Sequence, residues 1–291
     1  MSLPKRGKIM DLTSPKTIRE IQNKFAFSFK KGLGQNFLTS RDVLLDICEA
    51  AEISEGVLEI GPGFGVLTKE LSAYAKKVVS IEIDDSLFDV LDYTLADCDN
   101  VKIIKGDALK LDLKALIEEE FPNKTISIAA NLPYYVTTPI ISKLLEEKLP
   151  VNNIVVMVQK EVAQRLSAKP GTKDYGAITL LCQYYTEPEI TTIVKAGLFV
   201  PPPKVDSAVL TLRKLPEPRV NPKDEKLFFK TIKAAFSQRR KTLLNCLSSA
   251  FPYPKEELEK ALLEIGIDPK RRGETLSIED FKDLADKLYE M

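Results

Sequence analysis

The segment "NLPYY" (131–135) combines a neutral amide, a proline and two tyrosines directly after an apolar run. The side-chain oxygen of Asn131 and the backbone carbonyl of Leu132 could accept hydrogen bonds from both hydrogens of an exocyclic base amine. Such acceptors favour a pyramidal nitrogen, which is a better nucleophile than the flat amine of a free base. Pro133 would hold this backbone rigid, and Tyr134 would stack on the ring. The alternative is that these residues only end a strand and fill the core.

The segment "VLEIGPGFGVLTKEL" (57–71) places Gly61, Gly63 and Gly65 where a predicted strand passes into a predicted helix. Glycine permits a sharp turn and a close approach of the backbone to a ligand, and the first amides of a helix are unpaired donors. Glu82, at the end of the next predicted strand, could accept hydrogen bonds from both hydroxyls of a ribose. These features indicate a nucleoside site, and a glycine-rich turn without a ligand is the alternative.

The glycine spacing separates two classes of nucleoside-binding enzyme. A dinucleotide-dependent dehydrogenase would have its third glycine where this chain has Val66. The observed spacing, with Glu59 ahead of it, resembles that of S-adenosylmethionine-dependent methyltransferases. Asp107, in "GDA" (106–108) after a third predicted strand, could accept a hydrogen bond from the amino group of an adenine. Because ligands of open α/β sheets bind at the carboxyl ends of the strands, we expect these groups to meet Asn131 in one crevice.

A second aromatic group is expected at this crevice. Phe199 precedes the rigid proline run of "LFVPPPKVDS" (198–207) and could stack on a base that has been taken out of its helix. The alternative is that Phe199 is an ordinary core residue.

Composition excludes several kinds of chemistry. The chain has no histidine, which excludes Ser-His and Cys-His catalysis and the commonest transition-metal ligand. Its four cysteines lie far apart, so zinc-ribbon and thioredoxin-like spacings are excluded and no metal is expected. There is no apolar run of the ~18 residues that a membrane span needs, and the N-terminus lacks the apolar core of a secretory signal. We therefore expect a soluble, cytoplasmic protein.

The pattern from about residue 54 alternates short apolar runs with amphipathic stretches, which predicts a parallel sheet with crossover helices. The predicted strands are 56–61, 77–83, 101–106, 125–131 and 152–159, with helices at about 65–74, 85–97, 112–121 and 138–147. Two further runs, 189–196 and 207–215, are predicted to pair antiparallel at one edge. The expected fold is α/β, a Rossmann-like arrangement with a seven-stranded, mostly parallel sheet.

Three segments are expected along the chain. A capped helix is predicted at 14–28 within a basic N-terminal arm (1–29), because residues 1–41 carry nine Lys/Arg against two Asp/Glu. A nucleoside-binding domain would span 30–215. The three prolines of "LPEPRVNP" then mark a boundary, and 216–291 is predicted to be a small all-helical domain.

Along nearly its whole length the sequence resembles the ribosomal RNA adenine N6,N6-dimethyltransferase family, and it is most similar to the bacterial small-subunit branch. The motifs that carry the resemblance are "KKGLGQNFL", "EIGPGFGVLT", "EID", "GDA", "NLPYYVTTP", "FVPPPKVDS", "AFSQRRKTL" and "RGETLSIEDF". The resemblance implies that two neighbouring adenines near the 3′ end of small-subunit ribosomal RNA each receive two methyl groups, late in subunit assembly. The implied cofactor is S-adenosylmethionine, with S-adenosylhomocysteine as product.

The resemblance also implies a set of cofactor-binding residues. They are Gln35, Asn36, Leu38, Glu59, Gly61, Gly63, Glu82, Ile83, Asp107, Ala108 and Asn131. Asn36 and Leu38 would contact the methionine end of the cofactor.

Cationic residues are expected to bind the RNA backbone. They are Lys30, Lys31, Arg239, Arg240 and Lys241. Such groups would grip phosphates without reading bases, which predicts a salt-sensitive affinity. The alternative for the arginines is a solvated helix surface. A monomer is the default expectation, because no long heptad pattern is present.

Three rival interpretations remain open. A macrolide-resistance methylase would modify a large-subunit ribosomal adenine with the same motifs. A non-catalytic ribosome-assembly or transcription factor could retain the fold, although intact Asn131, Pro133 and Tyr134 argue against lost chemistry. A dehydrogenase is disfavoured by Val66 and by the absence of histidine.

Overall fold

The computed structural model describes residues 10–27 and 35–291. The chain forms two compact units. The first comprises residues 1–160 and 190–211, and the second comprises 161–189 and 212–291. Each unit therefore contains two separate stretches of sequence.

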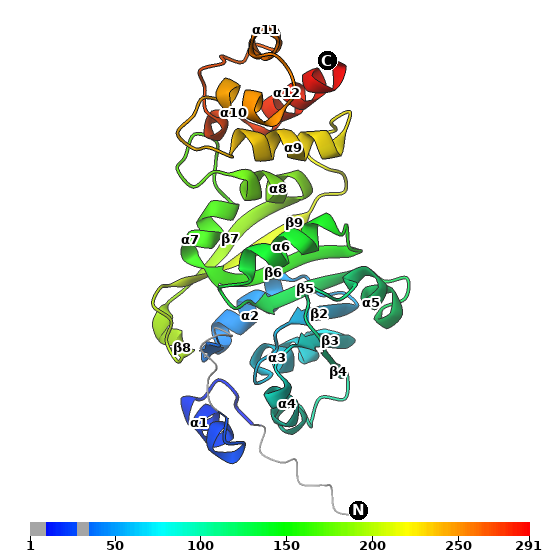
Figure 1. Cartoon of the computed structure of the whole chain (residues 1–291). Helices are drawn as coiled ribbons and strands as arrows, with labels where there is room; N and C mark the ends of the chain where they lie inside the picture. Colours follow the sequence, from blue (N-terminus) through cyan, green and yellow to red (C-terminus); the bar gives the residue numbers. More distant parts are fainter. Residues whose placement is uncertain (1–9, 28–34) are drawn as a thin grey trace, which may run out of the picture. The chain divides into compact units, whose positions relative to one another are not determined.

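A seven-stranded sheet with the order β4-β3-β2-β5-β6-β9-β7 runs through the structure (Figure 1). Its strands are β2 (Gly56–Ile60), β3 (Lys77–Glu82), β4 (Val101–Lys105), β5 (Ile126–Asn131), β6 (Val151–Gln159), β7 (Thr186–Val194) and β9 (Ser207–Lys214). Strand β2 pairs in parallel with β3 and β5, β3 with β4, and β5 with β6. The predicted strands and the mostly parallel α/β sheet are confirmed, and β9 and β7 are neighbours, with β7 at one edge.

The crossover helices of the first unit begin at positions where the sequence favours the start of a helix. They are α3 (Val66–Tyr74), α4 (Phe88–Thr94), α5 (Leu113–Glu120) and α6 (Thr137–Glu146), with a short 3-10 helix η2 (Asp85–Leu87) before α4. Asp112 caps α5, because its carboxylate accepts a hydrogen bond from the Ala115 amide at 2.9 Å. The predicted helices at these places are confirmed to within a few residues.

Two helices before the sheet complete the first unit. Helix α1 (Pro15–Lys24) has proline at its first turn, as predicted. Helix α2 (Arg41–Ala50) was not among the predicted elements, and it packs against α3 and β6. Its buried residues, which include Leu44 and Ile47, join the core on one face of the sheet.

A two-stranded antiparallel sheet links distant parts of the first unit. Strand β1 (Phe37–Leu38) pairs with β8 (Phe199–Val200), so that Leu38 lies opposite Phe199. Strands this short have no periodic sequence pattern, and neither was predicted.

The second unit is helical except for the strand residues that it shares with the large sheet. Its helices are α7 (Lys160–Leu166, of which Lys160 belongs to the first unit), α8 (Ala177–Tyr185), α9 (Glu225–Ala235), α10 (Leu243–Ala250), α11 (Lys255–Glu264) and α12 (Ile278–Glu290). The helical nature of the C-terminal region is confirmed. The unit differs from the expected segment 216–291, because it also includes 161–189. The physical reason is packing, since the rings of Tyr184 on α8 and Phe228 on α9 lie 5.2 Å apart in one apolar core.

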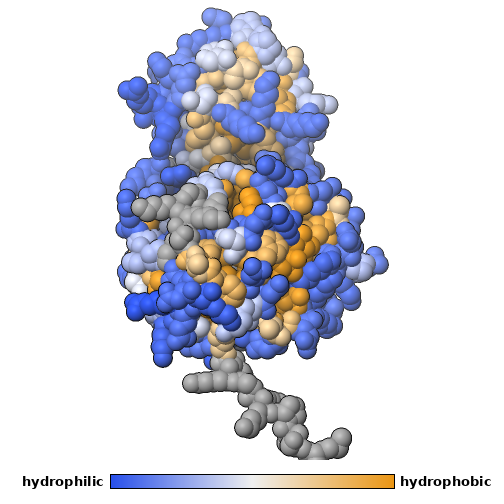
Figure 2. Space-filling view, turned by 60° about the horizontal axis from the view of Figure 1, so that its bottom comes forward, coloured by the Kyte–Doolittle hydropathy of each residue, from blue (hydrophilic) through white to orange (hydrophobic). Residues whose placement is uncertain are grey.

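Among the described residues, no helix combines the length and the apolar character that a bilayer crossing requires. Figure 2 shows a mainly hydrophilic face on which hydrophobic side chains gather in patches. The large hydrophobic side chains that are exposed include Ile83 and Tyr135.

Candidate functional site

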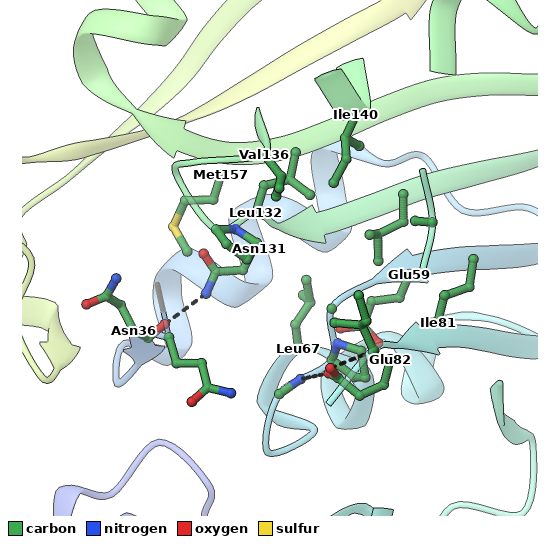
Figure 3. A pocket seen from close by; sticks show the side chains of 18 of the residues that line it. Asn36, Glu59, Leu67, Ile81, Glu82, Asn131, Leu132, Val136, Ile140 and Met157 are labelled. Carbon is green, nitrogen blue, oxygen red and sulfur yellow. Dashed lines mark hydrogen bonds between the residues drawn. The ribbon is translucent and has the colours of Figure 1, made fainter. Parts of the chain in front are cut away.

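A pocket of about 340 Å³ lies at the carboxyl ends of the parallel strands of the first unit (Figure 3). Segments that are far apart in sequence contribute to it: residues 35–38, the glycine-rich loop after β2, and the ends of β3, β4 and β5. The pocket lining contains every residue that the sequence assigned to the cofactor: Gln35, Asn36, Leu38, Glu59, Gly61, Gly63, Glu82, Ile83, Asp107, Ala108 and Asn131. The structure thus brings these residues together, and their roles stay a prediction.

The glycine-rich loop turns sharply between β2 and α3. Gly61, Gly63 and Gly65 have φ angles of 73°, 59° and 80°, in the left-handed region that other residues rarely adopt. A side chain built on Gly61 would meet nothing within 4 Å, so this glycine borders open space. Gly65 is the N-cap of α3, whose first amides follow directly.

Glu82 is a buried carboxylate at the end of β3. One of its oxygens accepts hydrogen bonds from the Ile83 and Asp84 amides at 2.8 Å, and the other accepts one from the Gly63 amide at 3.3 Å. Burial raises the pKa of Glu82, and these backbone hydrogen bonds oppose that rise. Because a carboxylate offers about four lone-pair sites, Glu82 can still accept a hydrogen bond from a ligand hydroxyl.

Glu59 lies beneath the same loop and is almost fully buried. One oxygen accepts hydrogen bonds from the Thr68 and Ser80 hydroxyls, each at 2.7 Å. The pKa of Glu59 is raised to about 7, because burial and, to a smaller extent, the charge of Glu82 raise it more than the two hydroxyls lower it. A carboxyl group that changes charge near neutrality therefore borders the pocket.

The residues that follow strands β4 and β3 form another part of the pocket lining. Asp107 accepts a hydrogen bond from the Leu109 amide at 2.9 Å, and its second oxygen lies 3.6 Å from the Lys110 ammonium. Ile83 is 53% exposed although it lines the pocket, so it offers an apolar surface to a ligand. This pairing of an acceptor with an apolar surface suits a purine ring.

Asn131 points across the pocket toward residue 36. Its Nδ2 donates a hydrogen bond to the Asn36 backbone carbonyl at 3.2 Å (Figure 3). Within residues 10–27 and 35–291, no hydrogen bond to its Oδ1 is present. The contact distinguishes the nitrogen of the Asn131 amide from its oxygen, because a carbonyl can accept a hydrogen bond but cannot donate one. The acceptor oxygen is thus left for another donor.

The loop after Asn131 is held by its own hydrogen bonds. The Leu132 amide donates to the Met157 carbonyl at 3.2 Å. The Pro133 carbonyl accepts from the Val136 amide at 3.1 Å and from the Thr137 hydroxyl at 3.3 Å, which closes a tight turn at the start of α6. No backbone donor among the described residues pairs with the Leu132 carbonyl.

Tyr134, which lines the pocket, is tied to the start of β9. Its hydroxyl lies 2.7 Å from the hydroxyl of Ser207, which is fully buried at the start of β9. Burial raises the pKa of Tyr134, so the phenol is neutral at physiological pH. The two motifs "NLPYY" and "KVDS" therefore meet through this hydrogen bond.

Phe199 is the candidate that the structure does not bring into the pocket. Its side chain is 3% exposed, it pairs with Leu38 through β8 and β1, and it is absent from the pocket lining. The expectation that Phe199 presents a stacking face is thus not matched by its placement, because apolar packing covers the ring.

The candidate RNA-binding cations have different positions. Lys30 and Lys31 lie outside the described residues. Arg239, Arg240 and Lys241 are exposed in the loop between α9 and α10 of the second unit, and the Arg239 guanidinium donates a hydrogen bond to the Lys173 carbonyl.

Several pocket residues were missed by sequence reasoning. They are chiefly Phe37, Ile81, Tyr135 and Met157. Phe37 and Tyr135 stand inside motifs that the sequence analysis quoted, so their position next to assigned residues was a usable signal. Ile81 and Met157 carry no such signal, because only the register of the sheet brings them to the pocket.

Comparison with known proteins places the chain in a family. The model of the ribosomal RNA adenine dimethylase family matches residues 26–290. The ribosomal RNA small subunit methyltransferase A of Bacillus cytotoxicus is 55% identical over 284 residues, covering 96% of this chain and 97% of that protein. The protein of the same name from Bacillus mycoides is 52% identical, with the same coverage.

Two solved structures have the same fold. A dimethyladenosine transferase from Plasmodium falciparum superposes with a TM-score of 0.70 and 28% identity, covering 85% of this chain and 95% of that chain. The 23S rRNA methyltransferase ErmE superposes with a TM-score of 0.66 and 28% identity, covering 87% and 99%. The Rossmann-like methyltransferase fold is confirmed.

Proposed function

The chain belongs to the ribosomal RNA adenine dimethylase family, and we propose that it uses S-adenosylmethionine to dimethylate N6 of two adjacent adenines in small-subunit ribosomal RNA. The target adenines lie near the 3′ end of that RNA, and the reaction occurs late in assembly of the small subunit. The relatives that share 52–55% identity support this choice of subunit, because they carry the name small subunit methyltransferase.

The observation that carries the proposal is the amide of Asn131, held across the pocket by Asn36 at 3.2 Å. Its Oδ1 and the Leu132 carbonyl are acceptors at a strand tip, beside the aromatic ring of Tyr134. An adenine amine that donates both hydrogens to them becomes more pyramidal, and its lone pair is freed from the ring. Tyr134 holds the base flat, since its hydroxyl is fixed by Ser207.

The residues of the pocket fit the proposed cofactor. The backbone at Gly61 borders open space, so a ligand can approach it closely. Glu82 holds ribose hydroxyls, and Asp107 accepts from the adenine amino group, with Ile83 against the ring face. Asn36 and Leu38 hold the methionine end. When bound, the cofactor supplies an electrophilic methyl group on a positively charged sulfur.

The chain's own residues also account for the proton that methyl transfer releases. The methylated amine is acidic, so its proton passes from the acceptor at Asn131 to water. No histidine base is required, which agrees with a chain that has none.

The second unit and the basic N-terminal segment are proposed to bind RNA. Exposed Arg239, Arg240 and Lys241 would grip phosphates, as would Lys30 and Lys31. In this division residues 1–29 form a basic arm, 30–215 the catalytic domain and 216–291 the helical RNA-binding domain. The protein would act as a cytoplasmic monomer on the assembling small subunit.

The test incubates the protein and methyl-labelled S-adenosylmethionine with two substrates in parallel: unmethylated small subunits and bare large-subunit RNA. Nucleoside mass analysis should find dimethyladenosine only from the small subunits. Dimethyladenosine only from large-subunit RNA would support the specificity named for ErmE instead, and its absence from both would favour a non-catalytic assembly factor.

The matched variant is Asn131→Ala, which should slow methyl transfer by roughly a hundredfold, as loss of one preorganised polar contact does in other enzymes. Cofactor affinity, measured by calorimetry, should change much less. Near-normal turnover would remove Asn131 from its proposed role.

A further inference from the structure

Phe37 fills the space that a side chain at Gly63 would occupy, and its neighbour Asn36 holds the amide of Asn131. We propose that Phe37 is a positioning residue that fixes the orientation of Asn131, because its ring packs against the glycine-rich loop and thereby holds the adjacent Asn36 carbonyl in place. The inference rests on the proposed function, since that function makes the Asn131 oxygen an acceptor for the target amine.

The docking of Phe37 is tight. A Cβ atom built on Gly63 would lie 2.8 Å from Cε1 of Phe37, closer than any real contact of this kind. The Phe37 ring also stacks on Phe64, with centroids 4.0 Å apart and planes inclined by 22°. Both contacts are to the glycine-rich loop, so residue 37 is held to the segment that we propose binds the cofactor.

The backbone after Phe37 is anchored independently. Strand β1 pairs with β8, where Phe37 lies opposite Val200. The Thr39 amide and hydroxyl both donate to the Leu198 carbonyl at 2.8 Å. With its side chain on the glycine-rich loop and its backbone on β8, residue 37 leaves the Asn36 carbonyl little freedom.

The Asn36 carbonyl matters because it decides the rotation of the Asn131 amide. A carbonyl has no donor, so the group that faces it must be the NH₂ of Asn131. With the opposite rotation, two oxygens would face each other and the NH₂ would meet the hydrogens of the target amine. Transfer would then lose its acceptor even though Asn131 is present.

A double-mutant cycle tests this coupling. Single-turnover methyl transfer is measured for wild type, Phe37→Leu, Asn131→Ala and the double variant. Phe37→Leu should slow wild type by about tenfold or more, a size typical of coupled neighbours, but should slow Asn131→Ala by less than about twofold. Equal losses in both backgrounds would overturn the proposal, because Phe37 would then act by general packing or on the cofactor alone.

Phe27→Leu is the matched control, since Phe27 belongs to the same aromatic cluster, 5.0 Å from Phe64, and does not line the pocket. It should lower the melting temperature as Phe37→Leu does, while slowing transfer by less than about threefold, because Phe27 packs edge-on against Phe37 at 6.5 Å but leaves the Phe37 ring itself in the pocket lining. A loss of rate as large as that of Phe37→Leu would contradict a specific role for Phe37. If Phe37→Leu does not fold, Phe37→Met, whose unbranched side chain adapts to irregular gaps, takes its place in the cycle.

A second readout needs neither cofactor nor RNA. The side-chain ¹⁵N amide signal of Asn131 is identified by its loss in Asn131→Ala. In Phe37→Leu its protons should exchange with water faster than in Phe27→Leu, because the bond to Asn36 is loosened. Unchanged exchange would overturn the inference. A wild type that forms no dimethyladenosine would instead defeat the proposed function.

Discussion

The hydroxyls of Tyr134 and Ser207 lie 2.7 Å apart and join the loop after β5 to the first residue of β9. Ser207 is fully buried, so its hydroxyl depends on this partner. Tyr134→Phe should lower the free energy of unfolding by ~1–3 kcal/mol, because it leaves a buried polar group unpaired. The ring remains, so methyl transfer should fall much less than in Tyr134→Ala. Urea unfolding and single-turnover rates measure the two effects, and equal rate losses in the two variants would contradict a stacking role.

Asn131→Asp separates the presence of an acceptor from its orientation. The variant has two side-chain oxygens where wild type has one, but it cannot donate to the Asn36 carbonyl that lies 3.2 Å from Nδ2 in wild type. We expect methyl transfer to fall by roughly a hundredfold, close to the loss in Asn131→Ala. Single-turnover kinetics at saturating RNA and cofactor is the measurement. A rate near that of wild type would show that any oxygen at this position suffices.

Gly63→Ala and Gly61→Ala form a matched pair, because both glycines have positive φ angles. Only Gly63 has a neighbour in the way, since its Cβ would lie 2.8 Å from the Phe37 ring. Gly61→Ala should cost ~1 kcal/mol of backbone strain, whereas Gly63→Ala should cost ~1–3 kcal/mol more through overpacking. Chemical denaturation of the cofactor-free protein measures which of the two substitutions lowers the free energy of unfolding more. A larger cost at Gly61 would contradict the packing described for Phe37.

Glu59 should make the stability of the cofactor-free protein depend on pH. Its pKa is raised from 4.5 to about 7 by burial, so between these values the folded protein holds a proton that the unfolded chain has lost. Its contribution to the free energy of unfolding therefore falls by about 3 kcal/mol as pH rises through this window, and is constant above it.

Glu59→Gln isolates this effect, because glutamine does not titrate. Relative to wild type, the variant should gain stability progressively from pH 5 to pH 8. Denaturant unfolding at several pH values supplies the measurement. A difference between the two proteins that stays constant across this range would show that Glu59 does not titrate there.

Arg240 offers the cleanest test of phosphate binding, because Arg239 is engaged with the Lys173 carbonyl. Arg240→Ala should weaken binding to small-subunit RNA. It should also reduce the slope of log K against log salt by about 0.7–0.9, the value for one lost phosphate contact. Lys260→Ala is the control, since Lys260 is an exposed cation on α11 beside Glu264. Equal effects of the two substitutions would indicate nonspecific attraction by net charge.

Much of the fold could be predicted because it depends on the local pattern of apolar residues and glycines along the sequence. Buried strands such as β5 and β6 are nearly continuous apolar runs, and the glycines after β2 mark a strand-to-helix turn. Helix α8 escaped prediction, because "AITLLCQYY" is apolar on most sides and its length does not distinguish helix from strand. Strands β1 and β8 escaped it because they pair across about 160 residues of sequence, and two residues carry no periodicity.

For the candidate site, too, some positions could be predicted from the sequence and others could not. Residues at strand ends, such as Glu82 and Asn131, were placed correctly in one pocket, because parallel strands share a carboxyl edge. The position of Phe199 was not predictable, since an aromatic residue before prolines suits a stacking surface and a core equally well. Its burial follows from the pairing of β8 with β1.

The discontinuous second unit has a consequence for dissecting the protein. A fragment cut at residue 216 would keep α9 to α12 but lose Leu180 and Tyr184, which belong to the same apolar core as Phe228. Such a fragment would expose that core to water and aggregate. An autonomous version needs residues 161–189 grafted ahead of residue 212, through a linker that replaces the intervening strands.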